Sequence, residues 1–233
     1  ANRLGARKAA AVATAFKSTQ LVNAQITGMP LRAEIENALL SNTKTNSRVA
    51  LGLDPDTATL LVTGGSLGAR SLNRAIDDAK SSLDAAGVQV LHIIGANSDL
   101  PEVRSKSLVR IKYCDRMDLA ISAADLAVCR SGASTVCEFG SAGLPSVFVP
   151  YPVGNGEQRF NAADLVEAGG AILVEDAKFT SDFVRDEVIP LISNSKRLKT
   201  MALAARGASI SDGTKRLYDL VRSVLLTKAK SAK

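Results

Sequence analysis

Tryptophan is absent from this 233-residue chain, histidine occurs once and cysteine occurs three times. The cysteines are Cys114, Cys129 and Cys137, and no two of them form a C-x-x-C pair. With His92 as the single histidine, this set favours neither a disulfide framework nor a Cys/His zinc site, and a reducing cytoplasm fits it best. The chain also has no run of about 18 uncharged apolar residues and no signal-peptide core, so it predicts neither a membrane span nor an export signal.

Nucleic acid is not an expected partner, although the net charge is +6. Eight of the 29 basic residues lie in the first 33 positions and in the Lys-rich tail, which leaves 21 against 23 acidic residues. Only nine aromatic residues are available to stack on bases. The basic ends have three possible explanations: a contact with anionic lipid, a contact with a pyrophosphate, or a solvated helix face with a frayed tail.

Apolar residues make up 46% of the chain and charged residues 22%, which is typical of a globular protein with a substantial core. Short β-branched apolar runs alternate with longer amphipathic segments, as in βα units. The expected strands are Thr59–Thr63, Val88–Ile94, Leu108–Tyr113, Leu126–Cys129, Ser146–Pro150 and Ala171–Val174. The expected helices are Ala69–Ala86, Met117–Ala124, Ser134–Ala142, Gln158–Ala168, Ser181–Ile192, Lys196–Ala205 and Asp212–Leu225. The sequence therefore predicts an α/β fold with a doubly wound, Rossmann-like parallel sheet.

This pattern divides the chain into four parts. They are a segment at 1–33, a linker at 34–47, the doubly wound domain at 48–210, and a C-terminal helix with a Lys-rich tail at 211–233. The first segment has an expected helix at Asn2–Ala15 and an expected strand at Gln20–Thr27. Because a lone helix and strand cannot bury their apolar faces, we expect this segment to be the remnant of a preceding domain.

The loop Gly64–Arg70 follows the first strand of the predicted domain. Its glycines permit close approach of a ligand, and the helix beginning near Ala69 would direct free N–H groups at an anion such as phosphate. A tight βα turn that merely needs glycine explains the loop equally well. The loop also matches the G-x-S-x-G elbow of serine hydrolases, but His92 is predicted on the next strand, which favours a core role for it.

Two further polar loops follow strands. The loop Arg130–Thr135 offers hydroxyls and free N–H groups before a helix, although Thr135 and Glu138 also fit a capping box that would explain both residues structurally. The loop Pro150–Asn161 carries several amides at a helix start, and amides in such a place are suited to bind sugar hydroxyls.

Five motifs recur here in a characteristic order and spacing. They are Gly28–Arg32, Gly64–Arg70, Cys129–Ala133, Ala142–Pro145 and Glu157–Asn161. Through nearly its whole length the chain thereby resembles the bacterial MurG family, glycosyltransferases that convert lipid I to lipid II. The resemblance implies the GT-B architecture of two Rossmann-like domains, with this chain as the C-terminal, donor-binding part. It also implies that a preceding domain supplies the catalytic base, so that the chain alone would bind the donor without transferring the sugar.

The resemblance implies a set of contacts to the diphosphate of UDP-N-acetylglucosamine. Arg32 and Ser66 would approach the phosphates. Thr135 and the N–H groups of Ala133 and Ser134 would lie beside them. These groups would stabilise the leaving UDP during an inverting transfer.

Further residues are implied for the rest of the donor. The backbone near Cys114 would pair with uracil, Met117 would pack against the base, and Glu138 would accept hydrogen bonds from both ribose hydroxyls. The residues implied to bind the N-acetylglucosamine hydroxyls are Glu157, Gln158 and Asn161.

No metal and no cofactor is expected. Asp54-Pro55-Asp56 does match the D-x-D that other glycosyltransferases use for a metal, but Asp and Pro are also ordinary in a turn before a strand. Arg32 and two helix N-termini would instead stabilise the leaving group.

The implied partners are UDP-N-acetylglucosamine, lipid I through the preceding domain, and an anionic membrane. The implied location is cytoplasmic, peripheral on the inner face of the cytoplasmic membrane. Two alternatives stay open: another UDP-sugar enzyme of GT-B fold, such as a UDP-N-acetylglucosamine 2-epimerase, and a non-catalytic nucleotide-sugar-binding module. An epimerase would need acid and base groups around the glucosamine, which the sequence does not identify.

Overall fold

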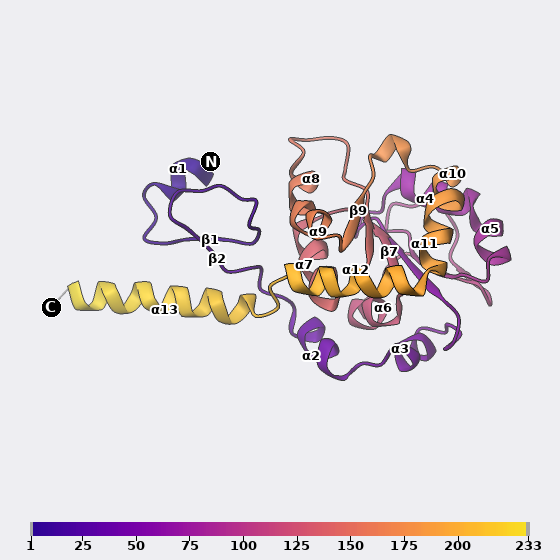
Figure 1. Ribbon diagram of the computed structural model, residues 1–233, viewed down its shortest axis with the longest axis horizontal. Coiled ribbons are helices and arrows are strands. Elements are labelled where there is room, and N and C mark those ends of the chain that lie inside the picture. Colours follow the sequence, from indigo (N-terminus) through magenta and orange to yellow (C-terminus); the bar gives the residue numbers. More distant parts are fainter. Residues whose placement is uncertain (1, 232–233) are drawn as a thin grey trace.

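The computed structural model describes residues 2–231 and contains a seven-stranded sheet with helices on both faces (Figure 1). The strand order is β5-β6-β4-β3-β7-β8-β9. The parallel strands are β3 (Thr59–Thr63), β4 (Gln89–Ile93), β6 (Leu108–Ile111), β7 (Leu126–Cys129), β8 (Ser146–Phe148) and β9 (Ala171–Leu173). This sheet confirms the predicted fold class and all six expected strands. The end of the predicted tail at Lys233 lies outside the described residues.

The strand order reverses between β3 and β7. From β3 the chain moves outward through β4 and β6, and it then returns to β7 beside β3 and moves outward the other way. The loops that follow β3 and β7 therefore leave toward opposite faces and open a crevice at the carboxyl edge of the sheet. They are the predicted loops Gly64–Arg70 and Arg130–Thr135.

Alternating strand residues point into two separate cores. Leu61, Leu91 and Ala127 pack against the helices of one face, and Leu60, Val62 and Val128 pack against those of the other. The first face is covered by α6 (Met117–Ala123), α7 (Ala133–Ala142) and α9 (Ala163–Glu167). The second is covered by α4 (Arg70–Asp78), α5 (Lys80–Ala85), η2 (Val184–Val188) and α11 (Ile189–Ser193). Both faces of the sheet are buried, as its near-continuous apolar strands require.

Several predicted helices are interrupted. Ala79 separates α4 from α5, and Ala162 separates α8 (Glu157–Asn161) from α9. The segment predicted as one helix at Ser181–Ile192 consists of α10 (Ser181–Phe183), the π-helical η2 and α11. Pro190 lies in the first turn of α11 and has no N–H to continue the α-helical pattern, which accounts for the irregular turn before it.

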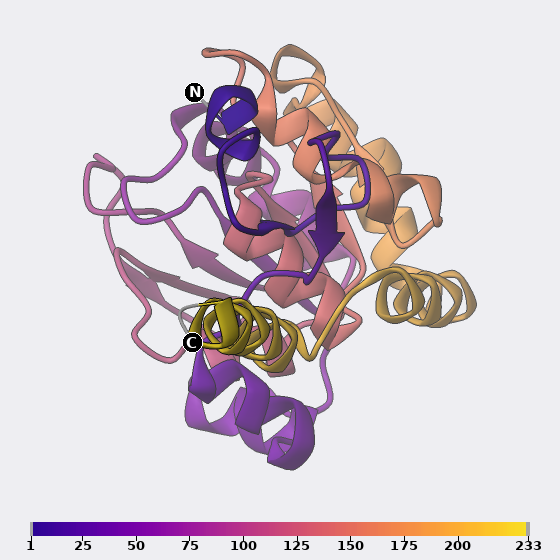
Figure 2. The same ribbon diagram turned by 90° about the vertical axis from the view of Figure 1, so that its left-hand side faces the viewer.

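Four further elements follow β4 in the chain and complete this part of the structure. They are β5 (Val103–Arg104), η1 (Asp176–Lys178), α12 (Ser195–Ala208) and α13 (Gly213–Ser231). β5 is antiparallel to β6, and with two residues it is too short to leave a sequence pattern. α13 confirms the predicted C-terminal helix and projects away from the sheet on the side of the N-terminal segment (Figures 1 and 2). Within residues 2–231, no helix combines the length and apolarity that crossing a bilayer requires.

The predicted helix at Asn2–Ala15 is wrong beyond its first turns. α1 is limited to Asn2–Ala6, and β1 (Val12–Thr14) runs parallel to β2 (Ala24–Ile26). The alanines suggested a helix, but helix propensity is a weak preference that tertiary contacts override. Val12 and Thr14 are β-branched and buried, and the Thr14 carbonyl accepts hydrogen bonds from the N–H groups of Thr27 and Gly28.

The stretch predicted as a linker at 34–47 is largely helical. It forms most of α2 (Ala33–Ser41) and the start of α3 (Lys44–Ala50), where the Thr43 hydroxyl caps α3 by accepting from the N–H of Asn46. Ile35 of α2 is only 1% exposed and belongs to the core beneath the first face. Much of the polarity around Thr43 therefore belongs to a helix cap, whereas the sequence pattern suggested a free linker.

The polypeptide enters the doubly wound domain near Gly28 and leaves it near Gly213, and these two segments lie side by side. A Cβ added to Gly28 would lie 2.7 Å from Cγ2 of Ile210, and one added to Gly213 would lie 2.4 Å from the carbonyl oxygen of Met29. The segment that enters the domain and the segment that leaves it are thus in contact through glycines. Gly213 lies against the backbone of Met29, and Gly28 lies against the side chain of Ile210, closer than a Cβ would allow.

Candidate functional site

A pocket of about 380 Å³ opens at the carboxyl edge of the sheet, and we call it the switch-point pocket. It lies beside the loop after β3, the end of β6 and the start of α7. Seven of the residues implied for the nucleotide line it: Arg32, Ser66, Cys114, Met117, Ser134, Thr135 and Glu138. Ala133 is the first residue of α7, directly before Ser134. The structure therefore brings together residues from widely separated segments of the sequence, as predicted.

The amino end of α7 presents free donors to the switch-point pocket. Its cap is Gly132, which offers no side-chain hydrogen bond, and the helical bonding series begins where the Val136 N–H donates to the Gly132 carbonyl. The N–H groups of Ala133, Ser134 and Thr135 consequently have no partner within the helix. The capping-box explanation is wrong, because Thr135 lies inside the first turn and Glu138 bonds elsewhere. Such a helix end attracts an anion.

Glycine is present at two positions of the loop after β3 for different structural reasons. A Cβ on Gly68 would lie 2.2 Å from the Ile94 carbonyl oxygen, and one on Gly95 would lie 2.1 Å from the Gly68 N, so these two βα loops pack backbone to backbone. A Cβ on Gly65 would meet nothing within 4 Å, and Gly65 lines the switch-point pocket with Ser66. Gly65 and Gly68 both adopt the left-handed backbone of the turn, but only Gly68 is packed against another loop, and Gly65 leaves open space beside the pocket.

Arg32 and Glu138 form a bidentate ion pair in the switch-point pocket. Arg32 donates from Nε to Oε1 at 3.0 Å and from its terminal nitrogen to Oε2 at 3.1 Å. The Arg32 side chain is 52% exposed and that of Glu138 only 9%. The hydrogen bond to Glu138 raises the pKa of the Arg32 guanidinium, so the group stays charged.

The three residues implied for the sugar are not among those that line this pocket. Gln158 Oε1 accepts from the N–H of Tyr151 at 2.9 Å, and Asn161 Nδ2 donates to the carbonyl of Ser131 at 3.1 Å. Glu157 begins α8 and is exposed. Two of the three thus stabilise the loop at 150–161 here, and their role toward a sugar stays a prediction.

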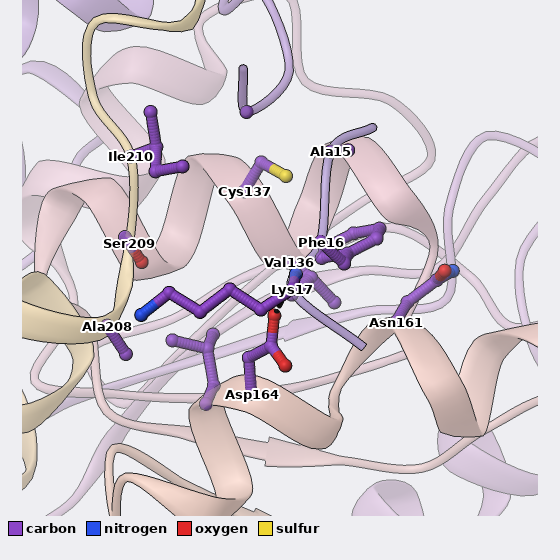
Figure 3. A pocket seen from close by; sticks show the side chains of 12 residues that line it. Ala15, Phe16, Lys17, Val136, Cys137, Asn161, Asp164, Ala208, Ser209 and Ile210 are labelled. Atoms are coloured by element: carbon purple, nitrogen blue, oxygen red, sulfur yellow. Dashed lines mark hydrogen bonds between the residues drawn. The ribbon is translucent and has the colours of Figure 1, made fainter. Parts of the chain in front are cut away.

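A second, smaller cavity marks where the N-terminal segment packs on the domain (Figure 3). Its volume is about 30 Å³, and its lining includes Phe16, Lys17 and Asp164. The backbone N–H of Lys17 donates to Oδ2 of Asp164 at 2.8 Å. A space of this size holds about one water, so it is a packing gap between the two parts and no ligand site.

His92 is a core residue, as the sequence favoured. It lies wholly buried on β4, with Nε2 3.1 Å from Oδ1 of Asn73. Because the Asn73 amide nitrogen donates to the Ile94 carbonyl, its oxygen faces His92, whose Nε2 carries the shared proton. Burial lowers the pKa of His92 to about 3. The serine-hydrolase interpretation thereby loses the only histidine that could serve as its base.

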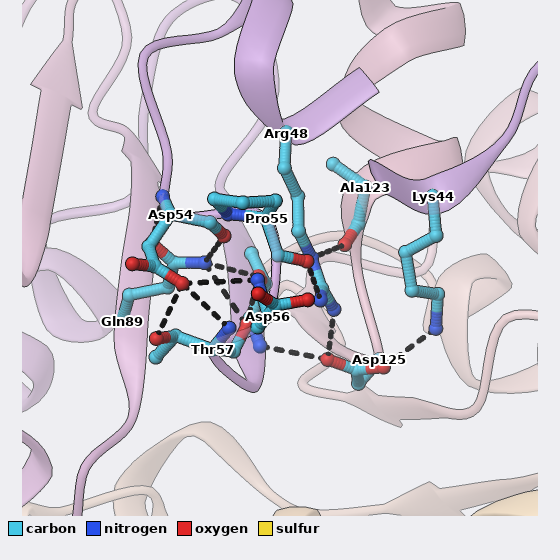
Figure 4. A network of polar contacts seen from close by, with 10 residues as sticks. Lys44, Arg48, Asp54, Pro55, Asp56, Thr57, Gln89, Ala123 and Asp125 are labelled. Atoms are coloured by element: carbon cyan, nitrogen blue, oxygen red, sulfur yellow. Dashed lines mark hydrogen bonds and ion pairs between the residues drawn. The ribbon is translucent and has the colours of Figure 1, made fainter. Parts of the chain in front are cut away.

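The D-x-D sequence is a structural turn (Figure 4). Oδ1 of Asp54 accepts from the N–H of Asp56 at 2.9 Å and from the N–H and hydroxyl of Thr57. The hydrogen bond from the Asp56 backbone contributes most to lowering the pKa of Asp54. The turn precedes β3 and lies at the amino edge of the sheet, away from the switch-point pocket. Among residues 2–231, no cluster of three or more His, Cys, Asp or Glu side chains could hold a metal ion.

Sequence reasoning missed the contribution of Arg130. Its guanidinium donates to the carbonyls of Val149 and Pro150 and to the hydroxyl of Ser71, pairs with Asp176, and lies over the ring of Tyr151. It therefore joins the carboxyl ends of several strands beside α7. An arginine directly after a buried strand was the available signal.

Lys112 and Tyr113 were also missed. Both line the switch-point pocket, directly after β6 and before Cys114. Their place at the carboxyl end of a predicted strand could have identified them.

Comparison with known proteins decides the family. Residues 59–217 match the glycosyltransferase family 28 C-terminal domain. The chain belongs to this family. A curated relative from Clavibacter michiganensis subsp. michiganensis, named UDP-N-acetylglucosamine--N-acetylmuramyl-(pentapeptide) pyrophosphoryl-undecaprenol N-acetylglucosamine transferase, is 47% identical, with 97% of this chain and 62% of the relative covered. A relative of the same name from Streptomyces coelicolor is 41% identical, with 99% and 64% covered.

Solved structures agree with this assignment. MurG of Acinetobacter baumannii matches with a TM-score of 0.73 and 26% identity, covering 93% of this chain and 61% of that protein. The calicheamicin glycosyltransferase CalG4 matches with a TM-score of 0.60 at 20% identity, which is a likeness of fold alone. The predicted resemblance to the MurG family and the GT-B fold class are confirmed. The chain spans under two thirds of the length of these curated relatives.

Proposed function

We propose that this chain is the donor-binding part of an inverting glycosyltransferase that moves N-acetylglucosamine from UDP-N-acetylglucosamine to lipid I, forming lipid II for peptidoglycan. The observation that carries the proposal is the switch-point pocket, where a guanidinium, a carboxylate and a free helix end meet. The proposed donor and acceptor are those that the names of the curated relatives state.

The proposed chemistry is displacement at the anomeric carbon by an acceptor hydroxyl, with UDP as the leaving group. Arg32, the Ser66 hydroxyl, the Thr135 hydroxyl and the first N–H groups of α7 stabilise the charge that develops on the diphosphate. The N–H groups of α7 are fixed by the helix before the reaction, and donors held in this way make electrostatic stabilisation effective.

Base and ribose recognition are proposed at the far side of the same pocket. The backbone near Cys114 pairs with the uracil edge, Met117 packs against the ring, and Glu138 accepts from the ribose diol. A buried carboxylate is a strong acceptor for a diol because its hydrogen bonds are charge-assisted.

Sugar recognition is proposed for Glu157, Gln158 and Asn161. The hydrogen bond from Asn161 to the Ser131 carbonyl supports this, because Ser131 leads directly into α7 and the loop is thereby anchored beside the phosphate end of the pocket. Discrimination between sugar epimers then depends on hydrogen bonds that the wrong epimer leaves unmade.

The proposed location is the inner face of the cytoplasmic membrane, with peripheral contact to anionic lipid. The exposed basic residues Arg3, Arg7 and Lys8, close in sequence to the exposed Leu4, support this contact. Lipid I is proposed to bind through a preceding domain, and nucleic acid is not proposed as a partner.

The test is calorimetric titration of the chain with UDP-N-acetylglucosamine, UDP and dTDP. We expect the uridine nucleotides to bind and dTDP, which lacks the 2′-hydroxyl that Glu138 would accept from, to bind at least about tenfold more weakly. Absence of UDP binding would overturn the proposal. An epimerase could not use the single histidine as its acid or base, because His92 is buried on β4.

A further inference from the structure

The Arg32–Glu138 ion pair engages both of the groups that the proposed function assigns to neighbouring parts of the nucleotide, Arg32 to the diphosphate and Glu138 to the ribose. Both oxygens of the carboxylate accept from the guanidinium, at 3.0 and 3.1 Å. Arg32 precedes α2, and Glu138 lies 106 residues later on α7. The pair therefore joins two segments that are far apart in the sequence and that both line the switch-point pocket.

The pair also changes the charge that an approaching phosphate meets. The residues that line the pocket include two basic side chains, Arg32 and Lys112, and one acidic side chain, that of Glu138. While Arg32 is paired with Glu138, its charge is compensated, and among the described residues that line the pocket Lys112 is the one basic residue outside that pair. A diphosphate consequently gains the full attraction of Arg32 only if the pair separates.

We propose that the Arg32–Glu138 pair is a latch that a nucleoside diphosphate opens by exchange of partners. The phosphates take over the guanidinium, and the ribose diol takes over the carboxylate. No covalent bond changes, and each charged group leaves one partner for another. The inference rests on the proposed function, since it deepens the recognition of the nucleotide at that site.

The two halves of the exchange are unequal. The Arg32 side chain is 52% exposed, so water can solvate it when it is released. Glu138 is 9% exposed, and a buried carboxylate without its partner is strongly unfavourable. Inorganic pyrophosphate, which can bind Arg32 but offers no diol, leaves Glu138 uncompensated. A complete nucleotide compensates both groups, so the latch selects against free phosphates and for the intact nucleoside diphosphate.

The latch predicts opposite effects of one substitution on two fragments of the ligand. Glu138→Gln removes the charge that holds Arg32 and should make the guanidinium available to pyrophosphate. The same change weakens the acceptor of the ribose diol and should weaken uridine binding. If Glu138 were only a contact residue for ribose, the substitution would leave pyrophosphate binding unchanged. If it were only a structural residue, both fragments would bind less well.

The experiment is calorimetric titration of the whole chain with inorganic pyrophosphate, uridine and UDP, for the wild type and for Glu138→Gln. We expect pyrophosphate to bind at least about fivefold more tightly to the variant, the lower end of typical coupling between sites, and uridine and UDP to bind more weakly. Glu187→Gln is the matched control, because Glu187 is exposed on η2 over the opposite face of the sheet. It makes the same chemical change and should leave all three affinities unchanged.

Equal or weaker pyrophosphate binding in folded Glu138→Gln, checked by its melting temperature, overturns the latch. Arg32→Gln tests it from the other side at a half-exposed position, and remains informative should Glu138→Gln fail to fold. Uridine should bind at least about fivefold more tightly to Arg32→Gln because Glu138 has lost its partner. Unchanged or weaker uridine binding there also overturns the latch. Both results leave the proposed function standing if UDP binds the wild type, whereas a wild type that does not bind UDP refutes that function as well.

Discussion

Gly68 illustrates how one residue can be required for packing inside a loop that is also proposed to bind a ligand. Its φ is +85°, and a Cβ would meet the Ile94 carbonyl oxygen at 2.2 Å. We expect Gly68→Ala to lower the free energy of unfolding by about 1–2 kcal/mol for the left-handed backbone, and by about 1–3 kcal/mol more for the contact with backbone that cannot move aside. Gly65 has a similar φ of +87° but lacks the contact, so Gly65→Ala should show only the loss that comes from the left-handed backbone. Urea unfolding measures both, and equal losses would contradict the packing explanation.

The buried His92 makes stability depend on pH. In the unfolded chain it takes up a proton near its ordinary pKa of about 6.5. In the folded protein burial lowers its pKa to about 3. Between these values the unfolded state binds more protons, so stability falls as the pH falls. We expect a loss of about 1–2 kcal/mol between pH 7 and pH 5 that is missing in His92→Gln. Urea unfolding at the two pH values tests this, and identical pH dependence in both proteins would refute it.

A substitution at Gln158 tests whether sugar recognition is separate from nucleotide recognition. If Gln158 binds the hexose, Gln158→Ala should weaken UDP-N-acetylglucosamine by about 0.5–1.5 kcal/mol, the net value of a typical hydrogen bond, and leave UDP unaffected. The same amide also accepts from the Tyr151 N–H, so the melting temperature is measured alongside. A parallel loss for both ligands in the calorimeter would place Gln158 outside the sugar site.

At the scale of elements, α2 decides whether residues 34–47 belong to the folded domain. Ile35 is 1% exposed in the core, so Ile35→Ala should cost about 2–5 kcal/mol of unfolding free energy, as for other buried aliphatic truncations. Asn37→Ala, two residues later on the same helix and exposed, is the control and should change little. Chemical denaturation distinguishes the two. A free linker would tolerate both substitutions equally.

The elements also show what a sequence pattern can and cannot predict. β3 and β7 have the predicted bounds. Strands buried on both faces of a parallel sheet have nearly continuous apolar sequences, so the ends of the apolar run indicate the ends of the strand. The helix predicted for the Ala-rich start was wrong because the burial of Val12 and Thr14 in a β1–β2 pair depends on residues farther along the chain.

The same limit applies to the site. The βα pattern predicted that the loops after β3 and β7 lie at the carboxyl edge of the sheet, and the family resemblance supplied the individual residues, seven of which line the switch-point pocket. They could not predict that Arg32 pairs with Glu138, because side-chain partners depend on packing between segments 106 residues apart. Nor could they predict that Gln158 and Asn161 bond to their own surroundings.

For the whole molecule, binding and transfer should be separable. The residues proposed for the donor extend from Arg32 to Asn161, and none of them is assigned the deprotonation of an acceptor. We expect this chain to raise its melting temperature with UDP-N-acetylglucosamine but not to transfer labelled sugar to a lipid I analogue. A protein extended to the full length of the curated relatives should do both. Robust transfer by the chain alone would mean that it already contains the base.

The close packing at Gly28 and Gly213, where the chain enters and leaves the domain, has a consequence for how such a domain can be exchanged between proteins. Because the chain comes in near Gly28 and goes out near Gly213, the polypeptide connections to the sheet and its helices lie at one place, although the N-terminal segment also packs on the domain through Lys17 and Asp164. A unit attached in this way can be exchanged for another without rerouting the rest of the polypeptide. Recombination at these two glycines would replace the switch-point pocket as one module, and a chimera joined there should fold where one joined inside α2 or α12 would not.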